Sequence, residues 1–203
     1  MSTQPKERPI IFSDEMVRAI LAGRKTQTRR IVKPFVMKPP PHHKLPTDVC
    51  SLNADPEFQF RNSCPYGQPG ERLWLRECWR VSSAHDYLPP CEIPSDVDVE
   101  YRASNYGKNI FDGKNRPSIH MPRWASRITL ENTGVRIERL QDISAADARA
   151  EGIQTPAPTV TNEQFDHDCV VAYRDLWESI NGPGSWDANP FVWVVKFRMV
   201  ENE

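Results

Sequence analysis

The chain has 203 residues, of which 38% are hydrophobic, and its 26 lysines and arginines nearly balance 27 aspartates and glutamates. This length predicts one globular domain with a single core, and a net charge of -1 excludes a polycation that binds nucleic acid through its overall field. Because the sequence has neither a long apolar stretch nor an apolar N-terminal signal segment, we expect a cytoplasmic protein without a membrane partner.

The first predicted element is a short amphipathic helix. Ser13 or Asp14 can cap its start, and Gly23 stands where a left-handed residue commonly ends a helix. The apolar residues between them recur at helical spacing: Met16, Val17, Ile20 and Leu21. We therefore expect a helix that is anchored at both ends.

A cluster of cations and hydroxyls follows this helix directly. Thr26, Thr28 and Ile31 favour an extended strand. A turn and a strand therefore gather four cations in one place: Arg24, Lys25, Arg29 and Arg30. Such a cluster binds anions or acts on polar substrates, but a solvated basic edge strand has the same composition, so the pattern leaves both interpretations open.

Two stretches rich in proline and polar residues, at 34–64 and 82–118, show little apolar periodicity. We interpret both as insertions within a single domain that spans residues 1–203. They separate the basic cluster from the second half of the chain, in which strands are expected to dominate.

The remaining elements include strands at 71–81, 121–130, 136–140 and 191–200, the first of them after a Pro-Gly turn. Ser144 opens a short helix that Gly152 closes. Thr161 or Asn162 opens the longest helix, whose core face contains Phe165, Cys169, Tyr173, Leu176, Trp177 and Ile180. This order predicts an α+β fold with a small, mostly antiparallel β-barrel or curled sheet and flanking short helices.

The five cysteines are odd in number and contain no Cys-x-x-Cys pair, which fits reduced thiols. Structural zinc usually takes its ligands in close pairs. A metal site is therefore disfavoured for the candidates Cys50, Cys64, Cys78, Cys91, His42 and His43. We expect no metal and no other cofactor, and the sequence does not specify an oligomeric state.

Aromatic and basic residues on the predicted strands indicate the substrate class. Trp124 follows Arg123, so a base could stack on the indole while the guanidinium holds a phosphate or ribose. Glu77 is expected to pair with the basic turn and orient Lys25 or Arg30, or to form a plain surface ion pair. Most of the tryptophans are expected in the core.

Several segments together resemble the ASCH domain, a family of the PUA-like superfamily, and most closely its phage and prophage members. The resemblance spans nearly the whole chain apart from the two proline-rich stretches, and its most specific part is the Gly-x-Lys-Thr-x-Thr-Arg run. The segments are Ile20–Arg30, Pro69–Glu77, Met121–Trp124, Leu140–Ser144, Ala150–Gly152, Gly184–Trp186 and the Val-Trp-Val-Val-Lys-Phe strand at 192–197. This resemblance implies a compact PUA-like β-barrel and an association with RNA.

Within that superfamily the chain is similar at its motifs to bacterial N(4)-acetylcytidine amidohydrolases, which use a Lys, a Thr and a Glu. The resemblance implies Lys25 as base, Thr28 as nucleophile and Glu151 as acid. It also departs from those enzymes, because this chain is about twice as long and has Gln27 and Arg29 where they have aliphatic residues. The neighbours Arg24, Thr26, Arg29 and Arg30 are substrate-binding candidates.

Elementary chemistry supports these roles. A threonine hydroxyl needs a neighbouring base, and a lysine serves as one only when burial or nearby cations lower its pKa. Lys25 must then lie in the turn after Gly23, with Thr28 on the strand proper. The C-terminal end of the short helix and the like charge of Asp147 would favour a protonated Glu151, as an acid requires.

Three functions stay open on the sequence alone. The first is hydrolysis of an acylated cytidine or a related modified nucleoside by Thr28. The second is an RNA-binding module in which the basic turn grips phosphates without catalysis. The third is a metal-independent ribonuclease that uses Lys25 and the arginines to stabilise a pentavalent phosphate.

Overall fold

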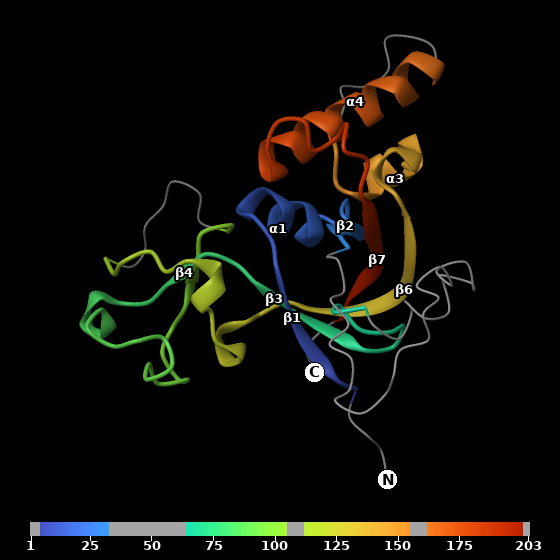
Figure 1. Ribbon diagram of the computed structural model, residues 1–203. Helices are drawn as coiled ribbons and strands as arrows, with labels where there is room; N and C mark the ends of the chain where they lie inside the picture. The colour runs from blue at the N-terminus through green and yellow to red at the C-terminus, as the bar shows by residue number, and fades with distance from the viewer. Residues whose placement is uncertain (1–4, 33–63, 105–111, 155–161, 201–203) are drawn as a thin grey trace, which may run out of the picture.

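The structure is a computed structural model that describes residues 5–32, 64–104, 112–154 and 162–200. Its main body is a five-stranded sheet with α1 on one side and α3 and α4 at one end, and a lobe around β4 extends away from this body (Figure 1). Within these ranges no helix combines the length and the apolar character needed to cross a membrane. The predicted insertion 34–64 lies outside the described residues except for Cys64.

The sheet contains β1 (Glu7–Ile11), β3 (Arg72–Arg76), β6 (Thr129–Arg139), β7 (Phe191–Val200) and β2 (Gln27–Ile31), in that spatial order. Strands β1 and β3 pair in parallel, and all the other neighbours are antiparallel. The predicted α+β class and the mostly antiparallel sheet are therefore confirmed. In the described part of the chain, β1 and β2 remain the two edges and no pairing between them closes a barrel.

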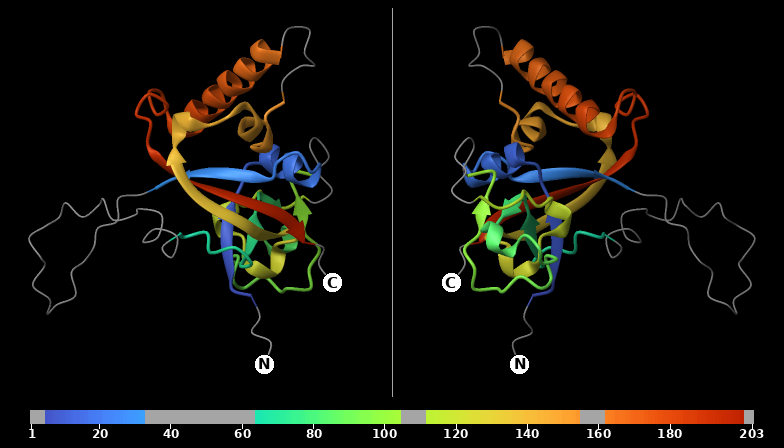
Figure 2. Two further views of the ribbon diagram at one scale, coloured as in Figure 1. Left: turned by 90° about the vertical axis from the view of Figure 1, so that its right-hand side faces the viewer. Right: turned by 90° about the vertical axis from the view of Figure 1, so that its left-hand side faces the viewer.

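The long strands β6 and β7 run side by side (Figure 2), and β7 carries residues of two hydrophobic clusters. Trp193 and Val195 of β7 join a cluster that includes α1, β1 and β3, whereas Val192 and Val194 join a cluster with α3 and α4. This alternation is the predicted period of two. Because Thr28 pairs with Val195 and Arg29 with Val194, neighbouring residues of the edge strand β2 also point to opposite faces.

The helices have the predicted end signals. Helix α1 (Asp14–Leu21) begins after Ser13, whose Oγ accepts a hydrogen bond from the Met16 amide, and Gly23 follows with a φ of +69°. Helix α3 (Ala145–Ala150) is capped by Ser144 and ends at Glu151. Helix α4 (Asn162–Asn181) packs on α3 and is followed by β7. These caps fix where the basic turn and Glu151 lie.

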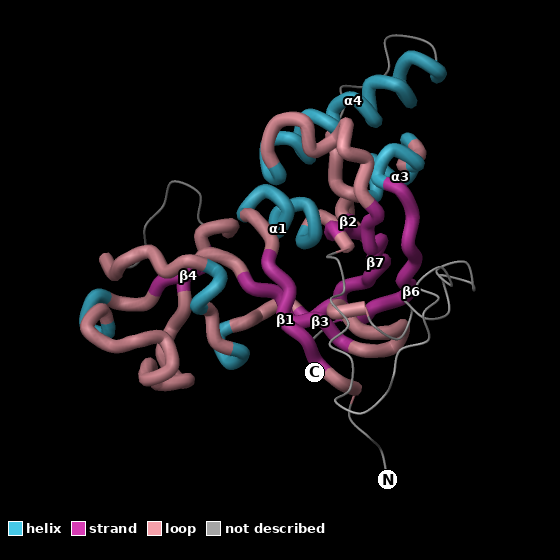
Figure 3. Tube along the Cα trace, in the orientation of Figure 1, coloured by secondary structure: helices cyan, strands magenta, loops and turns pink. Residues whose placement is uncertain are grey.

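The lobe consists mostly of loops with few strand residues, as the tube in Figure 3 shows. Its regular elements are β4 (Trp79–Arg80), β5 (Glu100–Tyr101) and the 3₁₀ turns η2 (Ser83–His85), η3 (Ser118–His120) and η4 (Arg123–Ala125). Trp79 and Met121 lie at the centre of its own cluster. The described part of the predicted insertion 82–118 therefore packs around a core and is not an unpacked excursion.

Three sequence predictions differ from the structure. The predicted strand 71–81 is two strands, β3 and β4, because the chain turns away from the sheet at Glu77. Residues 121–126 form η4 and its flanks instead of a strand, and the Ser126 hydroxyl donates to the carbonyl of Leu75. Strand β1 was not predicted, because it contains Pro9, which a short edge strand tolerates. The 3₁₀ turn η5 (Leu140–Asp142) ends β6.

Candidate active site around Lys25, Thr28 and Glu151

Lys25 and Glu151 are joined through their side chains and their backbones. The Lys25 Nζ atom donates to Glu151 Oε2 at 2.8 Å and to the Glu151 carbonyl oxygen at 2.8 Å. A main-chain bridge connects the same two residues, and the Thr26 amide donates to the Ala150 carbonyl oxygen at 2.9 Å. The turn after α1 and the end of α3 therefore hold these side chains together.

Burial lowers the pKa of Lys25. Its side chain is 0% exposed. Loss of solvation favours the neutral amine, and Glu151 opposes this effect by favouring the ammonium, while Arg30 and Arg29 add to the lowering. The net direction is a pKa below the ordinary value, which a lysine base requires.

Cations surround the Glu151 carboxylate. Arg29 Nη1 donates to Glu151 Oε1 at 3.2 Å, on the other side of the carboxylate from Lys25. The predicted repulsion from Asp147 is absent, because Asp147 pairs instead with Arg29 at 3.2 Å and with Arg136 at 3.0 Å. Glu151 thus contacts the two cations Lys25 and Arg29, and Asp147 has cationic partners of its own.

Arg29 is an internal cation and not a surface one. Its side chain is 0% exposed and contacts the carboxylates of Glu138, Asp147 and Glu151. Burial raises the pKa of Asp147, but Arg136 and Arg29 outweigh that effect and leave it below the ordinary value. Arg29 therefore positions Glu151 and has no free edge for a substrate.

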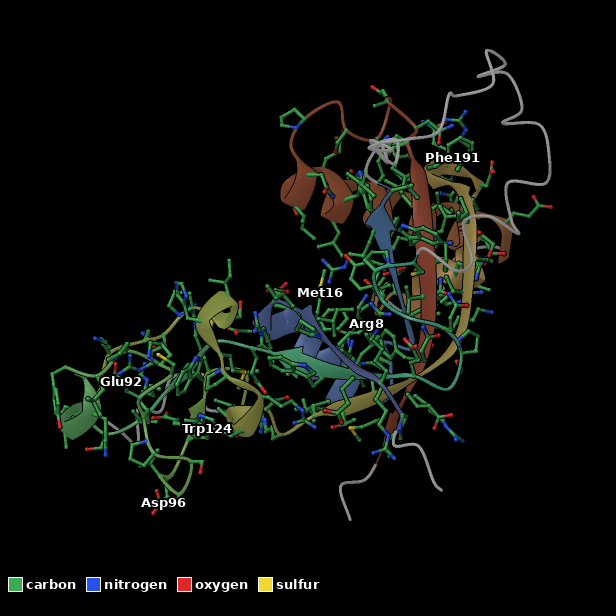
Figure 4. The ribbon with its side chains drawn as sticks, turned by 60° about the horizontal axis from the view of Figure 1, so that its bottom comes forward. Arg8, Met16, Glu92, Asp96, Trp124 and Phe191 are labelled. Atoms are coloured by element: carbon green, nitrogen blue, oxygen red, sulfur yellow. The ribbon has the colours of Figure 1, made fainter. Side chains whose placement is uncertain are left out.

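A pocket of about 420 Å³ lies over the edge strand β2, between α1 and the C-terminal half of α4. Figure 4 shows Met16 projecting from α1 toward α4 at this place. A pocket of this size accommodates a ligand as large as a nucleoside. Its lining residues are Ile11, Ser13, Met16, Thr28, Arg29, Arg30, Ile31, Tyr66, Glu151, Tyr173, Leu176, Trp177, Ile180 and Asn181.

Thr28 and Glu151 line this pocket together, whereas Lys25 is not part of its wall. Thr28 lies within β2 and is 3% exposed, and its hydroxyl makes no hydrogen bond to any described residue. Lys25 lies before the strand, in the turn, as predicted. The amine therefore reaches the pocket through its contact with Glu151, which stands between Lys25 and the open space.

The other candidates from the basic cluster have different places. Arg30 lines the pocket. Arg24 is exposed and lies outside it. Thr26 lines a second, smaller hollow of about 210 Å³ together with Lys25 and Phe197. Of the four predicted substrate-binding residues in this run, Arg30 is thus the one with a solvent-facing position in the pocket.

Three predicted substrate-binding residues lie away from the pocket. Glu77 pairs with Arg127 at 2.9 Å, and not with the basic turn as expected. Arg123 pairs with Glu7 at 2.7 Å. Trp124 lies in the lobe, as Figure 4 shows, where its ring meets the ring of Trp79 edge-on at 6.0 Å. The structure does not bring these residues to Thr28.

Aromatic residues also line this pocket, which the sequence did not predict. Tyr173 and Trp177 are buried in the core with α3, as predicted, but they also line the pocket. Tyr66 lines it from the chain segment before β3. The predicted core residue Ile180 is 56% exposed at the same place. The hydroxyl of Tyr173 and the indole N–H of Trp177 are polar atoms on the predicted core face of this helix. They were the sequence signal that this face also borders a pocket.

The described cysteines and acidic residues form no metal centre. Within the described ranges, no group of three or more His, Cys, Asp or Glu side chains lies close enough to hold a metal ion. Within the described ranges, no disulfide joins Cys64, Cys78, Cys91 or Cys169. The other metal candidates, Cys50, His42 and His43, lie outside the described residues.

Comparison with known proteins leaves the chain without an assigned relative. No family model, no curated protein and no solved structure matches it. The geometry of the pocket and the motifs in the sequence are therefore the observations that bear on function.

Proposed function

We propose that this protein is an ASCH-type amidohydrolase that acts on an acylated cytidine, such as an acetylated one, or on a related modified nucleoside. The five-stranded sheet would then be the PUA-like β-barrel of that family. The motif resemblance supports this proposal, and so does the meeting of Lys25 and Glu151, which are 126 positions apart in the chain.

The observation that carries the proposal is the buried Lys25 amine beside a pocket that contains Thr28. A neutral lysine has two N–H bonds and one lone pair. Both N–H bonds are accounted for by the two Glu151 oxygen atoms at 2.8 Å. The lone pair therefore stays available for a proton, which is the requirement for activating a hydroxyl.

In the first half of the reaction, the Thr28 oxygen attacks the acyl carbonyl carbon, and its proton passes to Lys25 by way of Glu151, which lines the pocket and contacts the amine at 2.8 Å. The tetrahedral intermediate then collapses, the carbon–nitrogen bond breaks, and the acyl group remains on Thr28 as an ester. The leaving nitrogen needs a proton. Because Glu151 faces the pocket and Lys25 does not, the proton moves from Lys25 to Glu151 across their 2.8 Å contact and then to the leaving amine.

In the second half, a water molecule attacks the ester carbon. Its proton goes through Glu151 to Lys25, the bond between Thr28 and the acyl group breaks, and the proton returns by the same route to restore the Thr28 hydroxyl. The products are the carboxylic acid and the free amine. Glu151 keeps the role of proton donor and receives its proton from Lys25 across their 2.8 Å contact.

The direct test is release of acetate and cytidine from N(4)-acetylcytidine by the purified protein, followed by chromatography. Thr28→Ala should lower kcat/KM at least about 1,000-fold, because the nucleophile is lost, and Thr28→Ser should retain part of the activity. Thr133→Ala is the matched control, since Thr133 is exposed on β6 and outside the pocket. Full activity of Thr28→Ala would refute the nucleophile.

The pH profile tests Lys25. Its pKa lies below the ordinary 10.5, and the base is the unprotonated amine, so kcat/KM should rise with pH and level off once Lys25 is neutral. Lys25→Met should abolish hydrolysis and with it this rise. A profile that is flat from neutral to alkaline pH in the wild-type protein would show that no amine of this kind limits the reaction.

The two other functions from the sequence are outcomes of the same experiments. An RNA grip by the basic turn requires accessible cations, but the side chains of Lys25 and Arg29 are both 0% exposed. Salt-sensitive RNA binding without acetate release would favour a binding module. Cleavage of RNA into shorter fragments without added metal would favour a ribonuclease.

A further inference from the structure

The pocket contains one positive charge that no carboxylate neutralises. Arg30 donates from Nη2 to the Ile11 carbonyl oxygen and lies over the ring of Phe12 at 5.3 Å. No ion pair joins it to any residue that the structure describes, and its Nε is buried without an acceptor there. Its neighbour Arg29, in contrast, contacts three carboxylates. Arg30 is therefore fixed in place and still able to bind an anion.

Two phenol groups share the pocket with this charge. Burial raises the pKa of Tyr66 and that of Tyr173, and Arg30 lowers both in part, so its charge acts on each of them. The net direction keeps both phenols protonated, and a protonated phenol donates a hydrogen bond. Neither hydroxyl is hydrogen-bonded to a described residue. The space near Arg30 is therefore bordered by donors.

A third donor comes from α4. Trp177 is 5% exposed and lines the pocket, and its Nε1 is buried without a hydrogen-bond partner among the described residues. A buried donor without an acceptor is costly, so it usually indicates a missing partner. The carboxylate of the pocket, that of Glu151, is already bound by Lys25 and Arg29. Among the described residues of the pocket, no further acceptor-rich, negatively charged group is left to pair with these donors.

We propose that the pocket recognises its ligand through a phosphate held by Arg30, so that the preferred ligand is a nucleotide and not a free nucleoside. The nucleoside part of this inference rests on the proposed function. Guanidinium groups bind phosphate oxygens through charge-assisted hydrogen bonds, and the phenol and indole donors complete the set. The 420 Å³ volume and the apolar wall of Met16, Leu176 and Ile180 leave room for a base.

Calorimetric titration of the whole protein with cytidine and with cytidine 5′-monophosphate tests this inference without any hydrolysis. The monophosphate should bind about 10- to 100-fold tighter at low salt, as expected for a charge-assisted contact, and Arg30→Gln should remove this difference. Arg174→Gln is the matched control, because Arg174 is exposed on α4 and outside the pocket. It should bind both ligands as the wild type does.

Two further probes identify the source of the phosphate. A cytidine dinucleotide that binds as tightly as the monophosphate would indicate an internal phosphate of RNA, and weaker binding would indicate a free nucleotide. Equal affinity for cytidine and its monophosphate, no binding of either at millimolar concentration, or an unchanged preference in Arg30→Gln would each overturn the inference. Acetate release is measured separately, so nucleotide binding without hydrolysis would refute the amidohydrolase and leave the phosphate site standing.

Discussion

Two ion pairs in this protein join distant positions of the chain around a buried acid, and they differ in their surroundings. In the pair of Lys25 and Glu151, the side chains are 0% and 4% exposed, and the acid lines a pocket beside Thr28. In the pair of Arg127 and Glu77, the acid is 1% exposed but the cation is 28% exposed. In the first pair the Lys25 side chain is fully buried and its acid lines the pocket. In the second pair the acid is buried where the sheet meets the lobe.

The second pair connects the sheet to the lobe. Arg127 binds both Glu77 oxygen atoms, at 2.9 and 3.0 Å, and stacks over the ring of Tyr101 at 4.0 Å. The Glu77 amide lies 3.4 Å from the sulfur of Met121 in the lobe cluster. Protein groups pair with both charges in this arrangement. The ion pair therefore has a structural role, and neither charge needs a ligand. The comparison shows that a buried ion pair indicates chemistry only where a reactive group and a pocket accompany it.

The largest effect is expected from Glu151→Gln. It leaves Lys25 with one oxygen acceptor fewer and removes a charge partner of Arg29, so the free energy of unfolding should fall by about 3–5 kcal/mol. Urea unfolding measures this change, and acetate release should be lost as well. The double variant Lys25→Met/Glu151→Gln should recover part of the stability, because the unpaired amine is gone. A loss below about 1 kcal/mol in the single variant would contradict tight coupling of the pair.

A smaller effect is expected from Glu77→Gln. Arg127 is partly exposed and can be solvated, so the loss of unfolding free energy should be at most about 1 kcal/mol and smallest at neutral pH. Burial raises the pKa of Glu77 above 4.5 despite Arg127. The stability that Glu77 contributes is therefore present at acid pH and is lost as the pH rises through the folded-state pKa. Glu77→Gln should remove this pH dependence of the free energy of unfolding. Acetate release should stay unchanged, and a large loss of activity would refute the contrast between the two pairs.

The smallest effect is expected from Arg123→Ala. Arg123 and Glu7 are 43% and 32% exposed, and exposed ion pairs contribute at most about 1 kcal/mol. Thermal unfolding should change little, with unchanged nucleotide binding and hydrolysis. Because the sequence suggested Arg123 as a substrate contact, a clear loss of binding in this variant would return the lobe to the candidate site.

Much of the first half of the site is predictable from local sequence. Ser13 and Gly23 bound α1, and the turn after Gly23 places Lys25 before the strand that contains Thr28. The capping Ser144 likewise predicts where α3 ends and where Glu151 stands. Caps and turns are decided by neighbouring residues, which is why these positions could be predicted.

The rest depends on tertiary contacts. No local pattern reveals that Arg29 faces three carboxylates from β6 and α3, or that α4 packs so that Tyr173 and Trp177 border the pocket. Strand β1 is defined mainly by its parallel partner β3, and a pattern of five residues with a proline is too short to show this. Tertiary packing alone buries the Arg29 side chain. This burial keeps its guanidinium from contacting a phosphate.

The contact between Lys25 and Glu151 spans 126 residues. Closing a chain segment of that length costs roughly 4 kcal/mol in entropy, so this contact forms only when the surrounding sheet already holds both ends together. Until residue 151 has emerged from the ribosome, Lys25 of a nascent chain cannot pair with Glu151. Assembly of the candidate site is in this way a late event of folding.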